Sequence, residues 1–298
     1  MSLMAAGTIE IPNSTGTSFD HGALEPETRR VFIAHTARDC LEVVDADTNT
    51  HLATLQGFRG AAGVAAGKGS VLVTNRGGAS LAWVDARTLE TRTVLKTGPR
   101  PNGVAAVPSL QLAVVACIGD DTHPPQLQVL GLEGDRTWSI ELPGRPRWCV
   151  VDATEARVFL AIRNPSMVLV ATLPDLKMVQ HWPLPSDGAH GMDINHEANR
   201  LYVACDGGML VEVDARSGQT PHQWPLAGVP DATFYNPTSG LVHVAIEDPG
   251  LIQSFDPRTG ASTRFITAVG AKTTALVEPD RLYVFSPLHK GVLELTGA

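Results

Sequence analysis

A phrase of about forty residues recurs seven times along this chain and limits the folds that it can adopt. Each copy contains a Gly/Pro turn, a strand, a polar turn, a second strand and, in most copies, a third strand that closes in Asp. The second strands read RVFIAH, VLVTN, LAVVAC, RVFLAI, RLYVAC, LVHVAI and RLYVFS. These runs are short and rich in Val, Leu, Ile and Ala, and no long stretch has the apolar period of a helix. The sequence therefore predicts an all-β chain.

The spacing of the repeats indicates the architecture. The residues that open the first strands are 42, 40, 45, 43, 41 and 41 positions apart: Phe19, Ala61, Pro101, Pro146, Ala189, Pro230 and Ala271. Seven units of this length, with four short strands each, are the sequence signature of a β-propeller. We therefore expect one domain over residues 1–298, a seven-bladed β-propeller of four-stranded antiparallel blades.

The two ends of the chain predict how the ring closes. From Ala271 only 28 residues remain, which is room for three strands ending in GVLELTGA. Residues 7–12, GTIEIP, form a strand that belongs to no blade. If this strand is the outermost one of the last blade, both exposed edges disappear. A closed ring offers no edge for strand-mediated assembly, so we expect a monomer.

Two phrases of the chain also resemble a known repeat family. NRLYVACDGGMLVEVDARSG and RRVFIAHTARDCLEVVDADT are similar to the YVTN-type propeller repeat, in which a LYVAN-like strand precedes a VxVID-like strand and a T/S-G turn. The resemblance covers nearly the whole chain, although the third strands of blades three and four depart from it. It implies the propeller fold, which is shared by binding proteins, electron-transfer relatives and, in similar architectures, lactonases and lyases.

Composition bears on the class of partner. With 23 Lys and Arg against 31 Asp and Glu, the net charge of −8 gives no general attraction to nucleic acid or to an anionic membrane.

The start, MSLMAAGTIEIPNSTG, lacks the basic and apolar regions of a signal peptide, and no stretch approaches the length of a membrane span. We expect a cytoplasmic protein, although a leader removed during processing would leave the same start.

The cysteines indicate the same compartment. They lie in apolar strand-like runs, at spacings that match neither a zinc site nor a disulfide framework. The four residues are Cys40, Cys117, Cys149 and Cys205. We expect them to be small core residues in a reducing compartment.

The informative residues are those that differ between blades at equivalent places. The Asp residues that close third strands, such as Asp45, Asp85 and Asp214, are explained by turn chemistry. The first strand of each blade lines the central channel, and its leading end opens on one face. The residues after the seven openers are Asp20, Ala62, Asn102, Arg147, His190, Asp231 and Lys272. Packing alone does not require such a mixture of ionisable groups, so this ring predicts a ligand site.

The second strands end near the same opening. Their last or following residues are His35, Asn75, Arg76, Asp120, Arg163, Asp206, Glu247, Ser286 and His289. We therefore expect His190 and Asp206 of blade five to face one opening, the mouth of the channel.

The first interpretation of this ring is a metal-assisted hydrolase that acts on a small polar, anionic substrate. Oxygen and nitrogen donors favour one divalent cation, Ca²⁺, Mg²⁺ or Mn²⁺, bound by Asp20, Asn102, His190 and Asp231. Lactonases similar to the gluconolactonase group hold a cation at first-strand openings, where it polarises the lactone carbonyl. The predicted catalytic residues are His190 as general base, Asp231 and Glu247.

Cationic and aromatic side chains complete this prediction. Arg147, Arg163 and Lys272 would receive the anionic group of the substrate, since Arg binds carboxylates bidentately. Trp148 would stack on the ligand. The full set of predicted substrate contacts is Arg147, Lys272, Arg163, Trp148, His21, His35, Asn75 and His289.

Two other interpretations remain open. In a metal-free binding propeller, Asp20 pairs with Arg147 or Asp231 with Lys272, and the mouth docks a small molecule or a protein partner. In a lyase that resembles the streptogramin-inactivating propellers, a His and a Glu are the acid and base. The sequence NHEANR is not HExxH, and the chain has no GxSxG, P-loop or GxGxxG, so nothing indicates a protease, kinase or dinucleotide enzyme.

Overall fold

The short aliphatic runs form strands that are buried on both faces. Along the second strand of the first blade, Val31 and Ile33 pack against the last blade, whereas Phe32 and Ala34 pack against the second. Successive side chains of a strand point to opposite sides, so a sheet with a neighbour on each side needs continuous apolar sequence. This requirement explains why the second strands are unbroken aliphatic runs rather than alternating ones.

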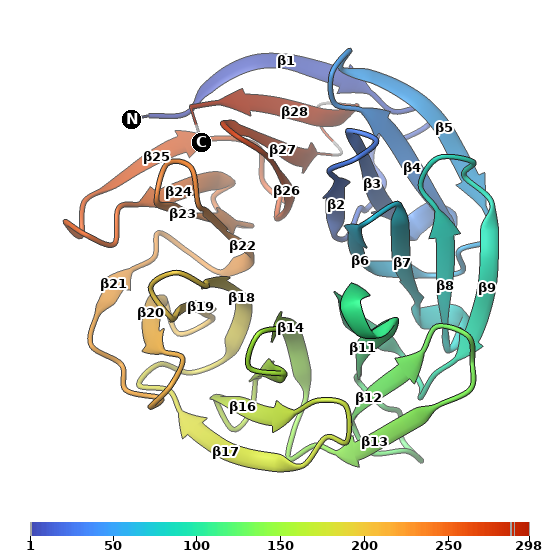
Figure 1. Ribbon diagram of the computed structural model, residues 1–298. Helices are drawn as coiled ribbons and strands as arrows, with labels where there is room; N and C mark the ends of the chain where they lie inside the picture. The colour runs from blue at the N-terminus through green and yellow to red at the C-terminus, as the bar shows by residue number, and fades with distance from the viewer. Residues whose placement is uncertain (1, 287, 289, 298) are drawn as a thin grey trace.

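The computed structural model describes residues 2–286, 288 and 290–297, and it contains seven four-stranded antiparallel sheets arranged as a ring (Figure 1). The predicted fold class, an all-β seven-bladed propeller, is confirmed. The first three blades contain β2 (Gly22–Glu25), β3 (Arg30–His35), β4 (Cys40–Asp45), β5 (Thr50–Gln56), β6 (Ala61–Gly67), β7 (Ser70–Asn75), β8 (Ser80–Asp85), β9 (Thr91–Lys96), β10 (Pro101–Val107), β11 (Leu112–Cys117), β12 (Gln126–Gly131) and β13 (Thr137–Glu141).

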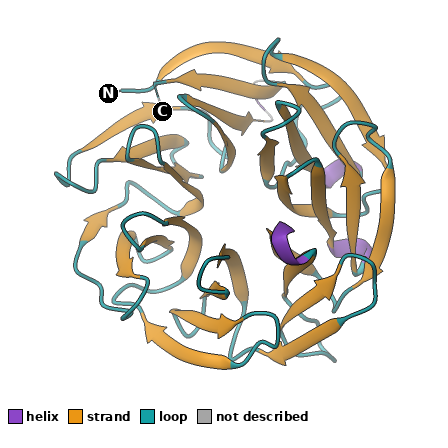
Figure 2. Cartoon of the chain, viewed as in Figure 1, coloured by secondary structure: helices purple, strands orange, loops and turns teal. Residues whose placement is uncertain are grey.

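Blades four to six follow the same order from the channel outward. They contain β14 (Pro146–Asp152), β15 (Arg157–Ile162), β16 (Met167–Thr172), β17 (Met178–Pro183), β18 (Ala189–Asn195), β19 (Arg200–Cys205), β20 (Met209–Asp214), β21 (Gln223–Pro225), β22 (Pro230–Asn236), β23 (Leu241–Ile246), β24 (Leu251–Phe255) and β25 (Ser262–Ile266). The helices η1 (Thr36–Arg38), η2 (Arg76–Gly78) and η3 (Pro108–Leu110) are single 3₁₀ turns between strands (Figure 2). No helix of the described chain has the length and hydrophobicity needed to cross a membrane.

The last blade joins the two ends of the chain. It consists of β26 (Thr273–Val277), β27 (Arg281–Ser286), β28 (Gly291–Thr296) and, at its outer edge, the N-terminal β1 (Met4–Glu10). In Figure 1, β1 lies along β28 and the two termini are close together. The antiparallel register places Ile9 opposite Val292, and Ile9 is buried against the blade. The N-terminal strand therefore closes the ring, as the fold prediction requires.

Local features follow the sequence closely. The carboxylates of Asp45, Asp85 and Asp214 each accept hydrogen bonds from the backbone N–H groups two and three residues later, which confirms their interpretation as turn residues. All four cysteines are buried and unpaired, as expected of core residues.

The closure predicts a stability effect at β1. Changing Ile9 to Ala should lower the free energy of unfolding by about 2–4 kcal/mol, because it removes buried apolar contacts and leaves a cavity beside Val292. Thr8→Ala, on the exposed side of the same strand, is the matched control and should change stability by less than about 0.5 kcal/mol. Urea unfolding measures both. Equal stability of the Ile9 variant and the wild type would contradict closure by β1.

Candidate functional site: the charged mouth of the channel

An irregularity in the register of the inner strands positions the site residues. In blades two to six the pairing of the first and second strands is interrupted between the opening residue and the third residue after it, for example between Ala189 and Met192. The residue directly after the opener lies in this interruption. The same local distortion therefore recurs around the ring, and it places Asn102, Arg147, His190 and Asp231 around one cavity.

The second residue after the opener determines how closely the inner strands approach. A Cβ at Gly63 would lie 2.1 Å from the backbone oxygen of Asn102, and one at Gly191 would lie 2.0 Å from that of Asp231, so only glycine fits at these two places. The equivalent positions in blades one and four hold His21 and Trp148. Their rings stack with centroids 4.1 Å apart, which brings two aromatic side chains together within the channel.

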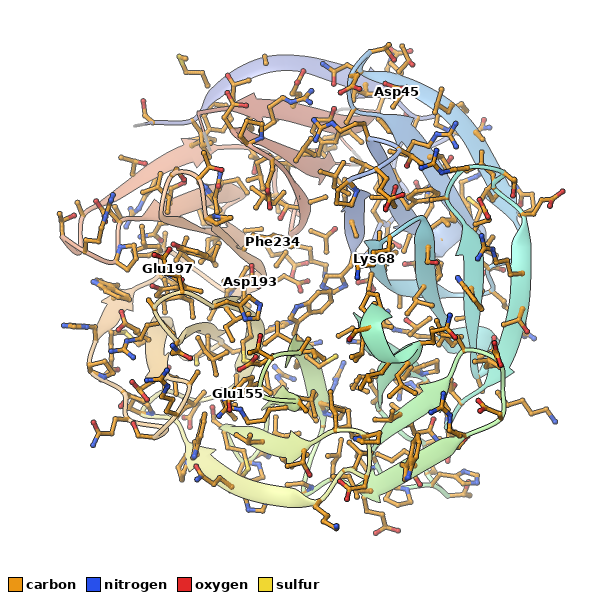
Figure 3. All side chains as sticks on the ribbon, in the orientation of Figure 1. Asp45, Lys68, Glu155, Asp193, Glu197 and Phe234 are labelled. Atoms are coloured by element: carbon orange, nitrogen blue, oxygen red, sulfur yellow. The ribbon has the colours of Figure 1, made fainter. Side chains whose placement is uncertain are left out.

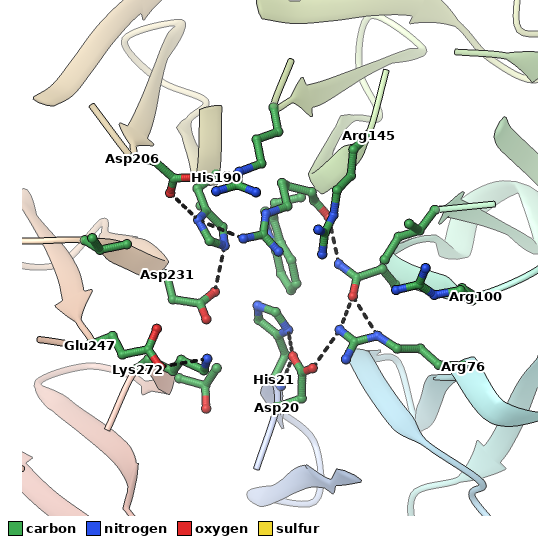
Figure 4. Close-up of a pocket in the computed structure, with 18 residues that line it drawn as sticks. Asp20, His21, Arg76, Arg100, Arg145, His190, Asp206, Asp231, Glu247 and Lys272 are labelled. Carbon is green, nitrogen blue, oxygen red and sulfur yellow. Dashed lines mark hydrogen bonds and ion pairs between the residues drawn. The ribbon is translucent and has the colours of Figure 1, made fainter. Parts of the chain in front are cut away.

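The result is a cavity of about 390 Å³, which we call the mouth cavity (Figure 4). Its residues from the first strands or from the segments that lead into them are Asp20, His21, Arg100, Asn102, Arg145, Arg147, Trp148, His190, Gly191, Val229, Asp231, Lys272 and Thr273. Those that follow the second strands are Arg76, Ile118, Arg163, Asp206 and Glu247. The structure thus brings together most of the residues that the sequence placed at the mouth, although Ala62 of the predicted ring does not line the cavity.

A few predicted residues do not line this cavity. His35 and Asn75 are the last residues of β3 and β7, and their side chains are buried outside it, His35 against Phe19 and Glu42 and Asn75 against Ser80. Asp120 forms an exposed turn with His123, and Ser286 is buried at the end of β27. His289 lies outside the described residues.

Two arginines at the rim were missed by the sequence analysis. Arg100 and Arg145 directly precede the openers Pro101 and Pro146, and both line the mouth cavity. The signal was present as the repeated dipeptide Arg-Pro, in GPRPNG and GRPRW. The prediction covered the residues after each opener and those at the ends of the second strands, and these two arginines precede openers.

His190 lies between two carboxylates in the wall of the cavity. Its Nδ1 is 2.8 Å from Oδ1 of Asp206, and its Nε2 is 3.3 Å from Oδ1 of Asp231. Burial by itself would lower the pKa of His190, but the hydrogen bonds to Asp206 and Asp231 outweigh burial and the pKa lies above its usual value. Burial opposes ionisation of Asp206, but His190 and Arg163, whose Nε is 2.7 Å from Oδ2 of Asp206, lower the pKa of Asp206 to about 2. The arrangement favours an imidazolium held in a fixed orientation.

The other carboxylates of the cavity are engaged by basic groups. Asp20 forms an ion pair of 2.7 Å with Arg76 and contacts His21, and Nε of Arg76 donates to Oδ1 of Asn102 over 3.0 Å. Although burial opposes ionisation of Asp20, these neighbours hold its pKa well below the usual range. Lys272 pairs with Glu247 at 3.0 Å. The metal-free interpretation expected Asp20 to pair with Arg147, or Asp231 with Lys272. In the structure Asp20 pairs with Arg76 instead, and Lys272 pairs with Glu247.

Three guanidinium groups have no carboxylate partner among the described residues. The side chains of Arg100 and Arg145 make no hydrogen bond or ion pair within the described chain, and Nε of Arg147 is buried without a partner. Arg147 Nη2 lies 3.2 Å from Nδ1 of His190, which already faces Asp206. Burial lowers the pKa of Arg147, and burial together with Arg163 and Arg100 lowers that of Arg145. Asp231 and Asp206 act in the opposite direction on the pKa of Arg147, so carboxylates compensate the positive charge on this side of the mouth only in part.

A separate group in blade one has the residue types of a metal site. Within the described part of the chain, one cluster of His, Cys, Asp or Glu side chains could hold a metal ion, formed by the fully buried His35, Cys40 and Glu42. Oε1 of Glu42 is 2.8 Å from Nδ1 of His35 and 3.4 Å from Sγ of Cys40, and Oε2 accepts from His51 and Thr54. Burial and Glu42 raise the pKa of Cys40 to about 12, which disfavours the thiolate that metals bind. The donor atoms already satisfy one another, so this cluster fits a structural network better than a metal site.

The comparisons with known proteins support the fold and no more. No protein-family model matches the chain, and no curated protein matches it either. A total of 1673 chains among the solved structures resemble it, so the fold by itself does not identify a function. One is hydrazine synthase from Kuenenia stuttgartiensis, with a TM-score of 0.82 over 97% of this chain and 99% of that chain and a sequence identity of 14%. The similarity to YVTN-type repeats stays an interpretation of the sequence.

The buried cluster of blade one predicts a pH-dependent stability. Burial opposes ionisation of Glu42, but the hydrogen bonds from His35, His51 and Thr54 lower its pKa from 4.5 to about 2. Because the folded pKa is the lower one, the ionised carboxylate contributes its full stability above about pH 4.5 and loses it as the pH falls toward 2. Glu42→Gln should therefore reduce the free energy of unfolding at neutral pH by on the order of 3 kcal/mol.

Urea unfolding of both proteins between about pH 6 and pH 3 measures this contribution. The difference between the wild type and Glu42→Gln should narrow as the pH falls. Glu90→Gln, which replaces an exposed carboxylate of blade two, is the control for the loss of one negative charge. A difference that stays constant across the range would show that Glu42 does not act through its ionised form.

Proposed function

We propose that the mouth cavity binds a small organic anion and that His190 is the acid–base group that acts on it. The observation that carries this proposal is the set of three guanidinium groups, those of Arg100, Arg145 and Arg147, that surround one cavity without carboxylate partners. Arg100 and Arg145 are exposed at the rim, whereas Arg147 is half-buried, and its buried Nε without an acceptor is costly unless a ligand supplies one. A carboxylate or a phosphate supplies acceptors in bidentate geometry.

The charges and the size of the cavity agree with this assignment. Six cationic side chains and four carboxylates line it, so it carries an excess of positive charge within a protein whose net charge is −8. A positive site on an acidic protein attracts small anions locally and not nucleic acid in general. A volume of about 390 Å³ suits a molecule of metabolite size.

The proposed chemistry is proton transfer by His190. Asp206 fixes the ring through Nδ1, and Nε2 points toward Asp231 beside the cavity. An oriented imidazolium can donate a proton to a leaving group or to a developing oxyanion, and the neutral ring can accept one. This geometry favours a metal-independent hydrolase or lyase acting on an anionic substrate.

The metal-assisted, lactonase-like reaction is the other form of this proposal. Asp20, Asn102, His190 and Asp231 would have to hold the cation, with Arg147 and Lys272 orienting the substrate. In their present positions Asp20 faces Arg76 and His21, Asn102 accepts from Arg76, and His190 faces Asp206 and Asp231. These contacts would have to be exchanged for metal ligation, so we rank the metal-independent reaction first.

Anion binding is predicted to depend on the unpaired arginines. Calorimetric titration with citrate, succinate and inorganic phosphate should detect binding of at least one of them. Arg147→Gln and Arg145→Gln should each weaken it by about tenfold or more, since each removes a charge-assisted contact. Arg264→Gln, on the exposed β25, is the matched control and should bind as the wild type does. Unchanged affinity in both mouth variants would refute the anion site.

Catalysis is predicted to depend on His190 and not on a metal. Among carboxylate-bearing lactones, esters and elimination substrates, any reaction that the protein accelerates should slow by about a hundredfold or more in His190→Gln and persist in EDTA. His181→Gln, at an exposed position on β17, is the control.

Metal analysis by mass spectrometry distinguishes the two forms of the proposal. One equivalent of metal that is lost from a folded Asp20→Ala/Asp231→Ala variant would favour the lactonase-like reaction. Metal that is lost from Cys40→Ala instead would belong to the cluster of blade one.

A further inference from the structure

The opposite end of the channel contains a second cavity of about 600 Å³, which we call the far cavity. The strand β18 connects the two ends: His190 and Gly191 line the mouth cavity, whereas Asp193, Ile194 and Asn195 line the far cavity. Figure 3 shows Asp193 and Phe234 beside the central opening on this face. Trp148 lines both cavities, so its side chain forms part of the wall between them.

The wall of the far cavity is mainly apolar and aromatic. It includes Leu24, Val64, Trp148, Ile194, Phe234 and Leu276, and Tyr235 adds a third aromatic residue. The mouth cavity has few such side chains. A ligand of the far cavity therefore needs an apolar body, because only apolar surface is compatible with most of this wall.

The charges of the far cavity are opposite to those of the mouth. Asp193, Glu197 and Glu278 line it, and within the described residues their carboxylates form no ion pair. The one arginine of the wall, Arg29, directs its guanidinium to Asp47 at 3.2 Å and to the backbone oxygen of Glu278. The exposed His196 is the other basic residue of the wall. Within the described residues, no basic side chain therefore forms an ion pair with these three carboxylates.

Backbone hydrogen bonds fix the carboxylate of Asp193 in the wall of this cavity. Its two carboxylate oxygens accept backbone hydrogen bonds from Ile194 and Tyr235, both of 2.8 Å. Burial nevertheless raises the pKa of Asp193 to about 6, and the nearby Glu278 acts in the same direction. A positive charge bound beside Asp193 would relieve both effects.

We infer that the far cavity binds an organic cation, an ammonium group on an apolar body. The ammonium lies toward Asp193 and Glu278, and the apolar body packs on Trp148 and Phe234. Aromatic faces attract cations through their quadrupole, and carboxylates in an apolar surrounding attract them more strongly than carboxylates in water. This site is independent of the proposed function, which concerns the other cavity and a ligand of opposite charge.

A bare metal cation fits this cavity less well. In the described chain, no cluster with metal-ligand spacing includes Asp193, Glu197 or Glu278. The apolar wall would also leave a hydrated ion without partners over most of its surface. An organic cation is therefore the occupant that the residues favour.

Calorimetric titration with benzyltrimethylammonium at about pH 8, where Asp193 is ionised, tests the inference. We expect binding to the wild type, and about tenfold weaker binding to Glu278→Gln and to Phe234→Leu. Glu155→Gln is the matched control, because it removes a carboxylate from the same face (Figure 3) that does not line the far cavity. Benzyl alcohol, which has the ring without the charge, should bind at least tenfold more weakly than the cation.

The inference is overturned if the cation does not bind below about 10 mM, if benzyl alcohol binds equally well, or if Glu278→Gln and Phe234→Leu both bind as the wild type does.

Arg147→Gln separates the two sites. This variant should bind citrate, succinate or phosphate about tenfold or more weakly and keep the affinity for benzyltrimethylammonium, so failure of either site leaves the other testable. Equal loss of both ligands in Arg147→Gln would overturn the independence of the far cavity.

Discussion

The antiparallel pairing of β1 with β28 is the interaction on which the ring depends. It joins residues from opposite ends of the chain and gives the seventh sheet its fourth strand. Without it, the outer edge of β28 would be exposed, and the apolar side of the last blade would lose Ile9 and Ile11. Closure also fixes the channel, because each first strand is held between two neighbours. The position of every mouth residue is therefore coupled to a contact at the rim of the molecule.

Much of this arrangement could be predicted from the sequence because the repeat encodes it. A fixed period places equivalent residues at equivalent points of the ring, so the position after each opener predicts a set of side chains around one mouth. Asn102, Arg147, His190 and Asp231 follow this rule, and the structure gives its cause in the interrupted pairing at the start of the inner strands. Turn residues such as Asp214 were equally predictable, since their contacts are local.

The errors arose where one residue along a strand decides the direction of a side chain. His35 and Asn75 end their second strands and lie outside the mouth cavity, whereas Arg76, Arg163 and Asp206 follow the strand and line it. Side chains alternate along β-structure, so a shift of one position exchanges a buried residue for a site residue. The pairing partners were also beyond the sequence, because Arg76 and Lys272 lie in the two blades that flank the blade of Asp20. Which guanidinium reaches it depends on side-chain geometry and not on the repeat.

The two ends of the channel are electrostatically different although one set of strands builds both. At the mouth, basic residues flank the openers of blades three, four and seven and follow the second strands of blades two and four, and three of them lack carboxylate partners. At the far end, carboxylates come from β18 and from the turns after β18 and β26. The positions that hold Gly63 and Gly191 in two blades hold His21 and Trp148 in two others, and these rings stack inside the channel. Because Trp148 forms part of the wall of both cavities, one aromatic residue lies between a positively charged end and a negatively charged end of the channel. The proposed anion and the proposed organic cation would therefore bind at opposite ends of the same set of inner strands.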